Sequence, residues 1–299
     1  MKATIEQSNV IPVTGGIRVP HGEQSIGTIL IHAGRLTFES TEKILQLQRE
    51  QGLRFGEAAL KLGLLSAADI DLALAHQFVC PYLVRGESKV SEQVISAYAP
   101  YSPQAKAVST LRSQLMLRWF NNTGTGKALA VISADRLEGR SFIAANLAVA
   151  FAQLGQKTLL IDADMRNPNQ HTMFGIENRS GLSAMLAGRG ATDTVIHRIP
   201  GLPDLSVLPS GAEPPNPLEL LARPLLPQLL ANLVLEFEVI ILDSPAIAEH
   251  ADAQSIAARA GAALVVARKG TSRMSHVRHA TEAVGHTSAM VVGSVLNDF

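Results

Sequence analysis

The sequence predicts an α/β fold, a doubly wound and mostly parallel sheet preceded by a small all-α domain. From residue 128 onward, short apolar runs alternate with helical segments, and residues 25–77 repeat a pair of helical segments. The stretch ALAVISADRLEGRSFIAANLAVAFAQLGQKTLLIDADMRNP reads as strand, loop, helix and strand. We therefore divide the chain into a mobile tail at 1–24, a helical domain at 25–85, a linker at 86–103 and an α/β domain at 104–299.

The composition excludes several classes of function. The formal net charge is zero, so no overall field attracts nucleic acid, and we expect no nucleic-acid partner. The single cysteine, Cys80, excludes an internal disulfide and a cysteine-based metal cluster, which suits a cytoplasmic protein. No run approaches the roughly 20 apolar residues of a membrane helix, so work at a membrane would require a partner that holds the protein there.

Two copies of one pattern fill the helical domain, at Ser25–Gln48 and Arg54–Gln77. In each copy a short helix should end at a glycine, Gly34 or Gly63, and these glycines lie 29 positions apart. A turn and a second helix should follow. The turn Ser66–Asp69 has the spacing of a capping box. Each copy is too small to bury its apolar face alone, so the two should pack together.

The α/β domain should begin with an amphipathic helix at Ala105–Phe120. A strand at Ala128–Ser133, a helix at Phe142–Leu154 and a strand at Thr158–Ile161 should follow. Further apolar runs predict strands at Leu205–Leu208, Val239–Leu242, Ala263–Ala267 and Met290–Leu296.

The loop after the first strand has the outline of a phosphate-binding loop. A standard loop reads G-x-x-x-x-G-K-[ST], with backbone N–H groups around the phosphates, a lysine on the β- and γ-phosphates and a hydroxyl on Mg²⁺. Here Ala134 replaces the first glycine, and Gly139-Arg140-Ser141 replaces Gly-Lys-Ser. The helix that follows still offers free N–H groups to an anion.

Carboxylates follow two of the predicted strands. LLIDADMRNP places Asp162 and Asp164 at a strand end, a spacing suited to Mg²⁺ or to accepting a proton, although one of the pair could simply cap the next turn. VIILDSPA ends an apolar strand at Asp243, the Walker B pattern that supplies a carboxylate near Mg²⁺. Because strand ends of a parallel sheet meet at one edge, the three segments predict one nucleotide site.

Residues 104–299 resemble the cytoplasmic domain of the bacterial tyrosine kinases that partner polysaccharide chain-length regulators, a branch of the P-loop NTPases that also includes chromosome-partitioning ATPases. The matching segments are EGRSFIAANLA, LLIDADMRNP, GLSAML, LPSGAEPPNPLELL and VIILDSPA. LPSGAEPPNPLELL favours the kinase branch, and in it we expect Asn216 to cap a helix with Pro217 at its first position and Glu219 as the capping-box acid.

The resemblance implies an ATP- and Mg²⁺-dependent protein tyrosine kinase, with these roles by position. The nucleotide would be bound by Arg136, Leu137, Glu138, Gly139, Arg140, Ser141 and Phe142. The metal would be held by Ser141, Asp164 and Asp243, and the catalytic residues would be Asp162, Asp164 and Arg140. Asp162 is the expected proton acceptor, although the two aspartates could exchange roles. Arg166 would lie near the phosphates or pair with an aspartate.

The repeats in 25–77 resemble the N-terminal domain of type II secretion and pilus-extension ATPases, whose best-matched members bind cyclic di-GMP. Arg54 is kept in the second copy, whereas Ser25 replaces the arginine of the first. With this domain in front, the chain as a whole resembles the exopolysaccharide chain-length determinant tyrosine kinases of the EpsG type. The implied partner is a membrane polysaccharide chain-length (co-polymerase) protein, and the implied location is cytoplasmic, peripheral to the inner membrane. Cyclic di-GMP binding and self-association stay open here.

Two departures from the kinase pattern, together with the added N-terminal domain, favour an alternative, a catalytically weak nucleotide-binding regulator of that membrane partner. Arg140 is a planar, forked cation where the pattern has a compact lysine, which favours binding over phosphoryl transfer. The chain lacks the C-terminal tyrosine cluster; its tyrosines are Tyr82, Tyr98 and Tyr101. The motif of the ring-forming helix, a Glu and two Arg at intervals of three, is reduced to Lys106, Ser109 and Arg112, so assembly by that route is not expected.

Overall fold

The computed structural model describes residues 25–32, 34–77, 81–121, 128–189 and 192–298. The expected tail at 1–24 and the residue Cys80 lie outside this described part. The chain divides into two compact units, Met1–Ala73 and Leu74–Phe299.

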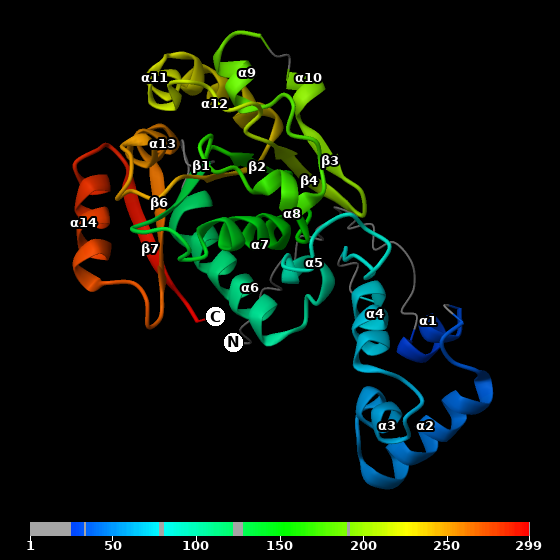
Figure 1. The fold of residues 1–299 in the computed structure, drawn as a ribbon. Helices are drawn as coiled ribbons and strands as arrows, with labels where there is room; N and C mark the ends of the chain where they lie inside the picture. Colours follow the sequence, from blue (N-terminus) through cyan, green and yellow to red (C-terminus); the bar gives the residue numbers. More distant parts are fainter. Residues whose placement is uncertain (1–24, 33, 78–80, 122–127, 190–191, 299) are drawn as a thin grey trace, which may run out of the picture. The chain divides into compact units, whose positions relative to one another are not determined.

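Helices and strands follow one another as shown in Figure 1. The helices of the first part are α1 Ile26–His32, α2 Phe38–Gln51, α3 Phe55–Lys61 and α4 Ala67–Gln77. The larger unit continues with α5 Ile95–Tyr98, α6 Pro103–Leu115, the π-helix η1 Met116–Phe120, β1 Ala128–Ser133, α7 Arg140–Ala152, β2 Thr158–Asp162, α8 Gln170–Phe174, α9 Leu182–Leu186, α10 Thr192–Val195, β3 His197–Ile199, β4 Leu202–Leu208, α11 Pro217–Ala222, α12 Leu225–Glu236, β5 Val239–Asp243, α13 Asp252–Ala260, β6 Ala262–Arg268, α14 Met274–Gly285 and β7 Met290–Asn297.

The first unit has the two-copy architecture that the sequence predicts. α1 and α3 are each followed by a left-handed glycine, Gly34 with φ 67° and Gly63 with φ 64°. The predicted capping box is confirmed: the Asp69 amide donates to the Ser66 hydroxyl at 3.2 Å and the Ser66 amide donates to the Asp69 carboxylate at 3.0 Å. The two copies share one core, whose buried residues are Ile29, Leu30, Leu36, Ile44, Ala58, Ala59, Leu65 and Ala73.

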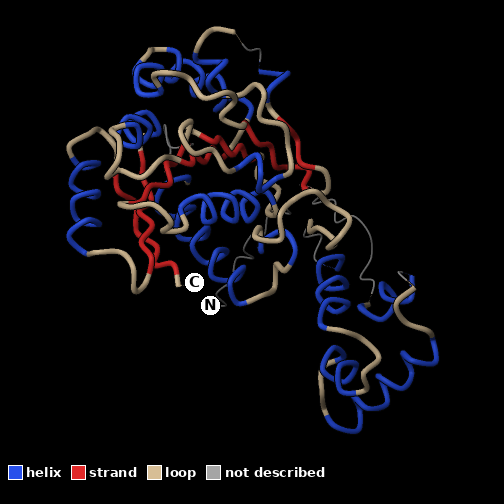
Figure 2. The backbone as a smooth tube through the Cα atoms, viewed as in Figure 1, coloured by secondary structure: helices blue, strands red, loops and turns tan. Residues whose placement is uncertain are grey.

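A seven-stranded sheet in the order β3-β4-β2-β5-β1-β6-β7 forms the middle layer of the larger unit (Figure 2). All neighbouring strands are parallel except β3, which pairs antiparallel with β4. This confirms the predicted mostly parallel sheet; β3 is a short edge strand that no apolar run indicated. The strand that follows β1 in the chain lies on one side of the β1–β5 pair, and the strand that follows β5 lies on the other. This switch point places the ends of β1, β2 and β5 at the crevice where such sheets bind ligands.

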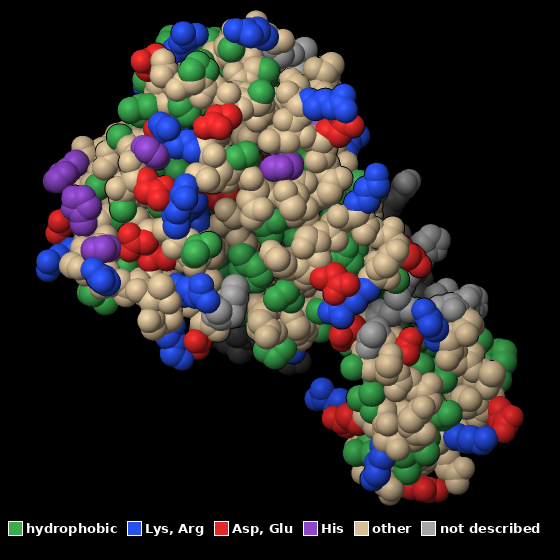
Figure 3. Space-filling model, in the orientation of Figure 1, with side chains coloured by type: hydrophobic (Ala, Val, Ile, Leu, Met, Phe, Trp, Pro, Cys, Tyr) green, Lys and Arg blue, Asp and Glu red, His purple; other side chains and the backbone are tan. Residues whose placement is uncertain are grey.

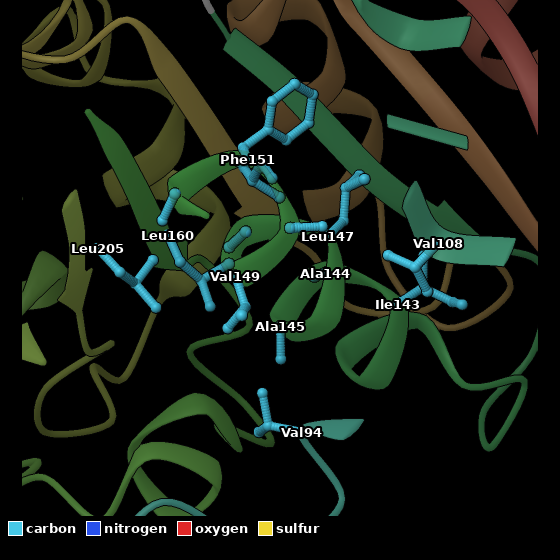
Figure 4. Close-up of a cluster of buried hydrophobic side chains, with 14 of the residues drawn as sticks. Val94, Val108, Ile143, Ala144, Ala145, Leu147, Val149, Phe151, Leu160 and Leu205 are labelled. Carbon is cyan, nitrogen blue, oxygen red and sulfur yellow. The ribbon is translucent and has the colours of Figure 1, made fainter. Parts of the chain in front are cut away.

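Alternate residues of each strand feed two separate cores. Leu129 and Val131 of β1 belong to a core with α5, α6, α7 and η1, whereas Ala130 and Ile132 belong to a core with α9, α11, α12, α13 and α14. Helix α7 is buried on nearly every side, which its run of alanines allows. Figure 4 shows its Ala145 facing Val94, a residue from the segment ahead of α6.

The segment ahead of α6 packs against the larger unit, whereas we expected a linker at 86–103. Leu83, Val90 and Val94 are buried in the α7 core of the larger unit. Asn146 of α7 accepts a hydrogen bond from the Ser96 amide at 2.8 Å, and Gln153 donates to the Pro81 carbonyl at 2.9 Å. Residues 81–99 thus pack as part of the α/β unit, because scattered apolar residues between prolines can dock on a helix without forming long elements themselves.

Acidic and basic side chains are interspersed on the face of the larger unit seen in Figure 3, in line with the zero net charge. Within the described residues, no helix has the length and apolar character needed to cross a membrane.

The capping box expected at Asn216 is not formed: the Asn216 side chain donates to Glu219 at 3.2 Å and makes no cap hydrogen bond to the helix.

Candidate nucleotide site

The loop from Ala134 to Gly139 joins β1 to the N-terminus of α7. Two of its residues have left-handed backbones, Leu137 with φ 60° and Gly139 with φ 89°. Successive turns of this kind direct backbone N–H groups toward one concave surface, and the first turn of α7 adds further free N–H groups. The loop is therefore shaped to hold an anion at the start of a 13-residue helix.

Glu138 anchors this loop from below. Its residue is 1% exposed, and its carboxylate accepts hydrogen bonds from the Asp135 amide and from the Ser272 hydroxyl. Its backbone carbonyl accepts a hydrogen bond from Asn297 at the end of β7. The loop is held by its own buried acid and by contacts with two distant segments.

Three carboxylates meet at the sheet edge beneath the loop. Asp162 ends β2 and Asp243 ends β5, and the two are direct neighbours across the parallel pair. Asp164 lies two residues past β2. All three are buried, with at most 3% of each residue exposed. The three side chains lie at one edge of the sheet, as the sequence predicts. The roles assigned to them stay predictions.

Asp162 lies behind the site and caps a helix. Its Oδ2 accepts the amides of Asn169 and Gln170, each at 2.9 Å, at the start of α8. Burial, together with the negative charge of Asp243, raises its pKa well above the usual value. It does not line the pocket described below, so a substrate hydroxyl would not reach it in this arrangement. This placement fits the capping alternative and differs from our expectation of a proton acceptor.

Asp164 is the carboxylate at the surface of the site. Its Oδ1 accepts the amides of Arg166 and Asn167, at 3.2 and 2.9 Å, which fixes the turn that follows β2. Its Oδ2 faces Arg140. Arg166 itself turns away and pairs with Asp252 at 2.7 Å, which confirms the second of the two alternatives for that residue.

Arg140 is the first residue of α7, and its side chain points into the protein. Its Nη1 donates to the Ser133 hydroxyl at 2.7 Å and its Nη2 to Asp164 Oδ2 at 3.3 Å. Its Nε lies 3.5 Å from Asp243 Oδ1, and the side chain is only 10% exposed. The guanidinium therefore lies between two of the carboxylates expected to hold a metal.

Gln170 is a site residue that sequence reasoning missed. It is fully buried, and its side-chain amide donates to Asp243 Oδ2 at 2.8 Å and to the Ser141 carbonyl at 3.1 Å. Burial raises the pKa of Asp243, whereas Arg140 and the hydrogen bonds from Gln170 and Ser141 lower it. A polar residue after Asn-Pro-Asn looked like part of a loop, and nothing local signalled its contact with a strand 73 residues away.

A pocket of about 500 Å³ opens over the loop. It is lined by Arg136, Leu137, Glu138, Gly139, Arg140, Ser141, Phe142, Asp164, Asn167, Pro168, Asn169, Ala246 and Glu249. All seven residues expected to bind the nucleotide are in this list, together with Asp164. Asp162 and Asp243 are not: they lie deeper.

The donor set suits a magnesium ion held together with phosphates. Mg²⁺ in such sites takes one or two carboxylates and keeps waters or substrate oxygens. Asp243 Oδ1 is a buried oxygen without a hydrogen-bond partner, and Ser141 and Asp164 lie beside it. In the described part of the chain, no three His, Cys, Asp or Glu side chains form a metal site by themselves, so a ligand would have to complete the shell.

Residues 129–299 match the family model described as the CobQ/CobB/MinD/ParA nucleotide binding domain. The chain belongs to this family. It is 33% identical over 210 residues to the tyrosine-protein kinase YwqD of Bacillus subtilis, covering 70% of this chain and 87% of that protein. The putative tyrosine-protein kinase EpsB of Ralstonia solanacearum is also 33% identical over 210 residues, or 70% of this chain, but this stretch is only 28% of that protein.

A solved structure agrees. The kinase domain of the Escherichia coli tyrosine kinase ETK superposes with a TM-score of 0.66 at 31% identity, covering 72% of this chain and 82% of that one. These findings confirm the predicted fold and the predicted resemblance to bacterial tyrosine kinases. The pocket over the loop lies within the part of the chain that matches this nucleotide binding domain family.

Proposed function

We propose that this chain is an ATP- and Mg²⁺-dependent protein tyrosine kinase that regulates exopolysaccharide chain length and export. One observation carries the proposal: the phosphate-type loop, Ser141 and Asp164 surround a single pocket at the switch point of the sheet, with Asp243 directly beneath. Relatives named as tyrosine-protein kinases support the reaction class.

In this proposal the residues of the chain have the following roles. Amides of the loop and of the first turn of α7 hold the phosphates, and Ser141, Asp164 and Asp243 hold the metal. Bound Mg²⁺ supplies charge neutralisation on the transferring phosphate. Asp164, at the pocket wall, is better placed than Asp162 to orient the accepting hydroxyl.

The accepting tyrosine belongs to another protein in this proposal. Tyr82, Tyr98 and Tyr101 are all half-buried. The Tyr98 hydroxyl donates to the Val90 carbonyl, and burial raises the pKa of Tyr82. A membrane chain-length protein is the substrate and partner that we propose, and it would hold the chain at the cytoplasmic side of the inner membrane.

The test uses the full chain and γ-labelled ATP with Mg²⁺, with and without the cytoplasmic segment of the proposed chain-length protein. Labelled phosphotyrosine on that segment supports the kinase. The matched control is Asp243→Asn, which removes the buried carboxylate charge but keeps its shape. Phosphotyrosine that is absent from native reactions, or equal in native and control reactions, rejects the proposal.

A second candidate is a catalytically weak, nucleotide-binding regulator of the same membrane partner. Arg140 favours it, because its guanidinium pairs with the carboxylates expected to hold the metal. Arg112 of α6 donates to the Ala150 carbonyl at 2.9 Å within the same chain, which does not favour self-association through that residue. In this alternative the helical unit binds cyclic di-GMP as a signal. Calorimetry of the full chain with cyclic di-GMP tests this binding directly.

A further inference from the structure

The Arg140 guanidinium lies between two buried carboxylates, which would otherwise need another cation beside them. Two buried carboxylates, Asp164 and Asp243, face each other across its guanidinium at 3.3 and 3.5 Å. Buried carboxylates without a neighbouring positive charge are costly, because the interior solvates them poorly. In this structure Arg140 provides that positive charge.

The pairing with Asp243 is incomplete. Arg140 Nε and Asp243 Oδ1 are both buried, and neither has a hydrogen-bond partner although they lie 3.5 Å apart. A buried donor and acceptor left without partners are unfavourable, because each has lost its hydrogen bonds to water. The guanidinium thus balances the charge of Asp243 without satisfying its free oxygen, which a smaller cation could contact directly.

We propose that the Arg140 guanidinium and a divalent cation are alternative occupants of the Asp164–Asp243 pair, and that nucleotide phosphates decide between them. The proposal deepens the proposed function and rests on it only in naming the nucleotide as the deciding ligand. Both occupants are cations that need the same carboxylate oxygens, so they exclude each other by charge and by space.

Phosphate offers Arg140 a second position. Arg140 begins α7 and also lines the pocket, so rotation of its side chain toward the loop brings the guanidinium to the anion site. Guanidinium binds phosphate through forked hydrogen bonds at least as well as it binds carboxylate. When Arg140 turns to phosphate, the carboxylates are released for the metal. Metal and nucleotide should therefore bind cooperatively, each strengthening the other by the same factor.

The experiment measures Mn²⁺ binding by the full chain at pH 8, using the electron paramagnetic resonance signal of free Mn²⁺, without nucleotide and with saturating ADP. Arg140→Gln removes the internal cation, and Arg140→Lys keeps a charge of shorter reach. Arg278→Gln is the matched control: it removes the same charge, but Arg278 lies on α14, does not line the pocket and pairs with Glu282 at 3.9 Å.

Without nucleotide, Arg140→Gln should bind Mn²⁺ about 5- to 150-fold more tightly than the native chain, the usual range of such coupling. Arg278→Gln should match the native chain. ADP should tighten Mn²⁺ binding to the native chain by a larger factor than to Arg140→Gln, because its phosphates can complete the metal shell in both chains but draw away a guanidinium only in the native one. If Arg140→Gln does not fold by circular dichroism, the same comparison is made with Arg140→Lys.

A gain below fivefold in the folded variant overturns the proposal, as does an equal gain in Arg278→Gln. If ADP binds to none of the chains, the nucleotide assignment of the proposed function fails, while the metal-only comparison still decides whether Arg140 and the cation exclude each other.

Discussion

Asn297 donates a hydrogen bond from its side-chain amide to the backbone carbonyl of Glu138, at 3.1 Å and across 159 residues of sequence. Asn297 is 4% exposed and ends β7, the last strand of the sheet. The phosphate-type loop is therefore packed directly against the end of the sheet. Gly139, the next residue of the loop, has no room for a side chain on that side.

Gly139→Ala should destabilise the larger unit and abolish nucleotide binding. A Cβ at this position would lie 2.0 Å from Asn297 Nδ2, and the backbone φ of 89° already disfavours a side chain. Strain and overpacking together should lower the free energy of unfolding by about 2–4 kcal/mol, measured by urea denaturation.

Gly155→Ala is the matched control. Gly155 has a similar φ of 75°, but an added Cβ would meet no atom within 4 Å. The Gly155→Ala substitution should lower the free energy of unfolding only through the strained backbone φ, by about 1 kcal/mol. Equal losses in the two variants would show that contact with Asn297 has no effect.

Leu137→Gly should stabilise the chain slightly. Leu137 has φ 60°, a conformation that costs a non-glycine residue about 1–2 kcal/mol, and its side chain is 84% exposed. Greater freedom of glycine in the unfolded chain offsets about 0.4–1 kcal/mol of the gain. Leu137→Ala, which keeps the strained backbone but removes the exposed side chain, should leave stability unchanged in the same denaturation experiment. A loss of stability on Leu137→Gly would mean that the leucine side chain itself holds the loop.

The strand and loop pattern of the α/β domain could be predicted from sequence because the relevant signals are local. Apolar runs of strand length mark β1, β2 and β5, and Asp162, Asp164 and Asp243 follow from where those runs end. The loop residues Arg136–Phe142 follow from their spacing in one motif. These signals depend on neighbours in the chain, which a single sequence contains.

The direction of each side chain could not be predicted in the same way. Arg140 lines the pocket, but its turn toward Asp164 and Asp243 depends on carboxylates that follow two other strands. Asp162 was expected to do chemistry, whereas the amides that it caps come from α8. Gln170 was missed altogether. Contacts of this kind are decided by packing between distant segments, which spacing does not encode.

Asn146→Ala should destabilise the larger unit if residues 81–99 fold as part of it. Asn146 accepts the Ser96 amide at 2.8 Å and donates to the Gln93 carbonyl at 3.2 Å, and it is fully buried. Alanine leaves these groups unsatisfied, at a cost of about 1–3 kcal/mol in urea denaturation. Asn232→Ala, an exposed asparagine of another helix, is the control and should be neutral. A neutral result for Asn146→Ala as well would indicate that the segment contributes little to the fold.

Asp162→Asn should make the chain more stable than native by an amount that grows with pH. Burial and the charge of Asp243 raise the pKa of Asp162, so the folded state favours the protonated acid. The stability from that preference is fully present below the unfolded pKa, near 3.9, and is lost as pH rises toward the folded pKa. The asparagine has no such loss and its carbonyl oxygen still accepts both α8 amides.

Urea denaturation of both chains between pH 5 and pH 8 measures the difference. It should widen by at most about 1.4 kcal/mol per pH unit and then level off. A difference that stays constant over this range, or narrows with rising pH, would contradict a raised pKa of Asp162 in the folded state.

Arg140→Lys should increase phosphoryl transfer more than it changes nucleotide affinity. Lysine has one compact charged group, so it cannot contact Ser133, Asp164 and Asp243 together as the guanidinium does. It should leave the carboxylates to the metal and follow the charge that develops on the transferring phosphate, where positioning and electrostatics provide most of the catalysis. Turnover with γ-labelled ATP should rise by about tenfold, or 1.4 kcal/mol in the barrier, while calorimetry with ADP changes little. An unchanged or lower turnover would mean that the arginine serves the reaction as it stands, and that the paired position seen here is simply its resting place.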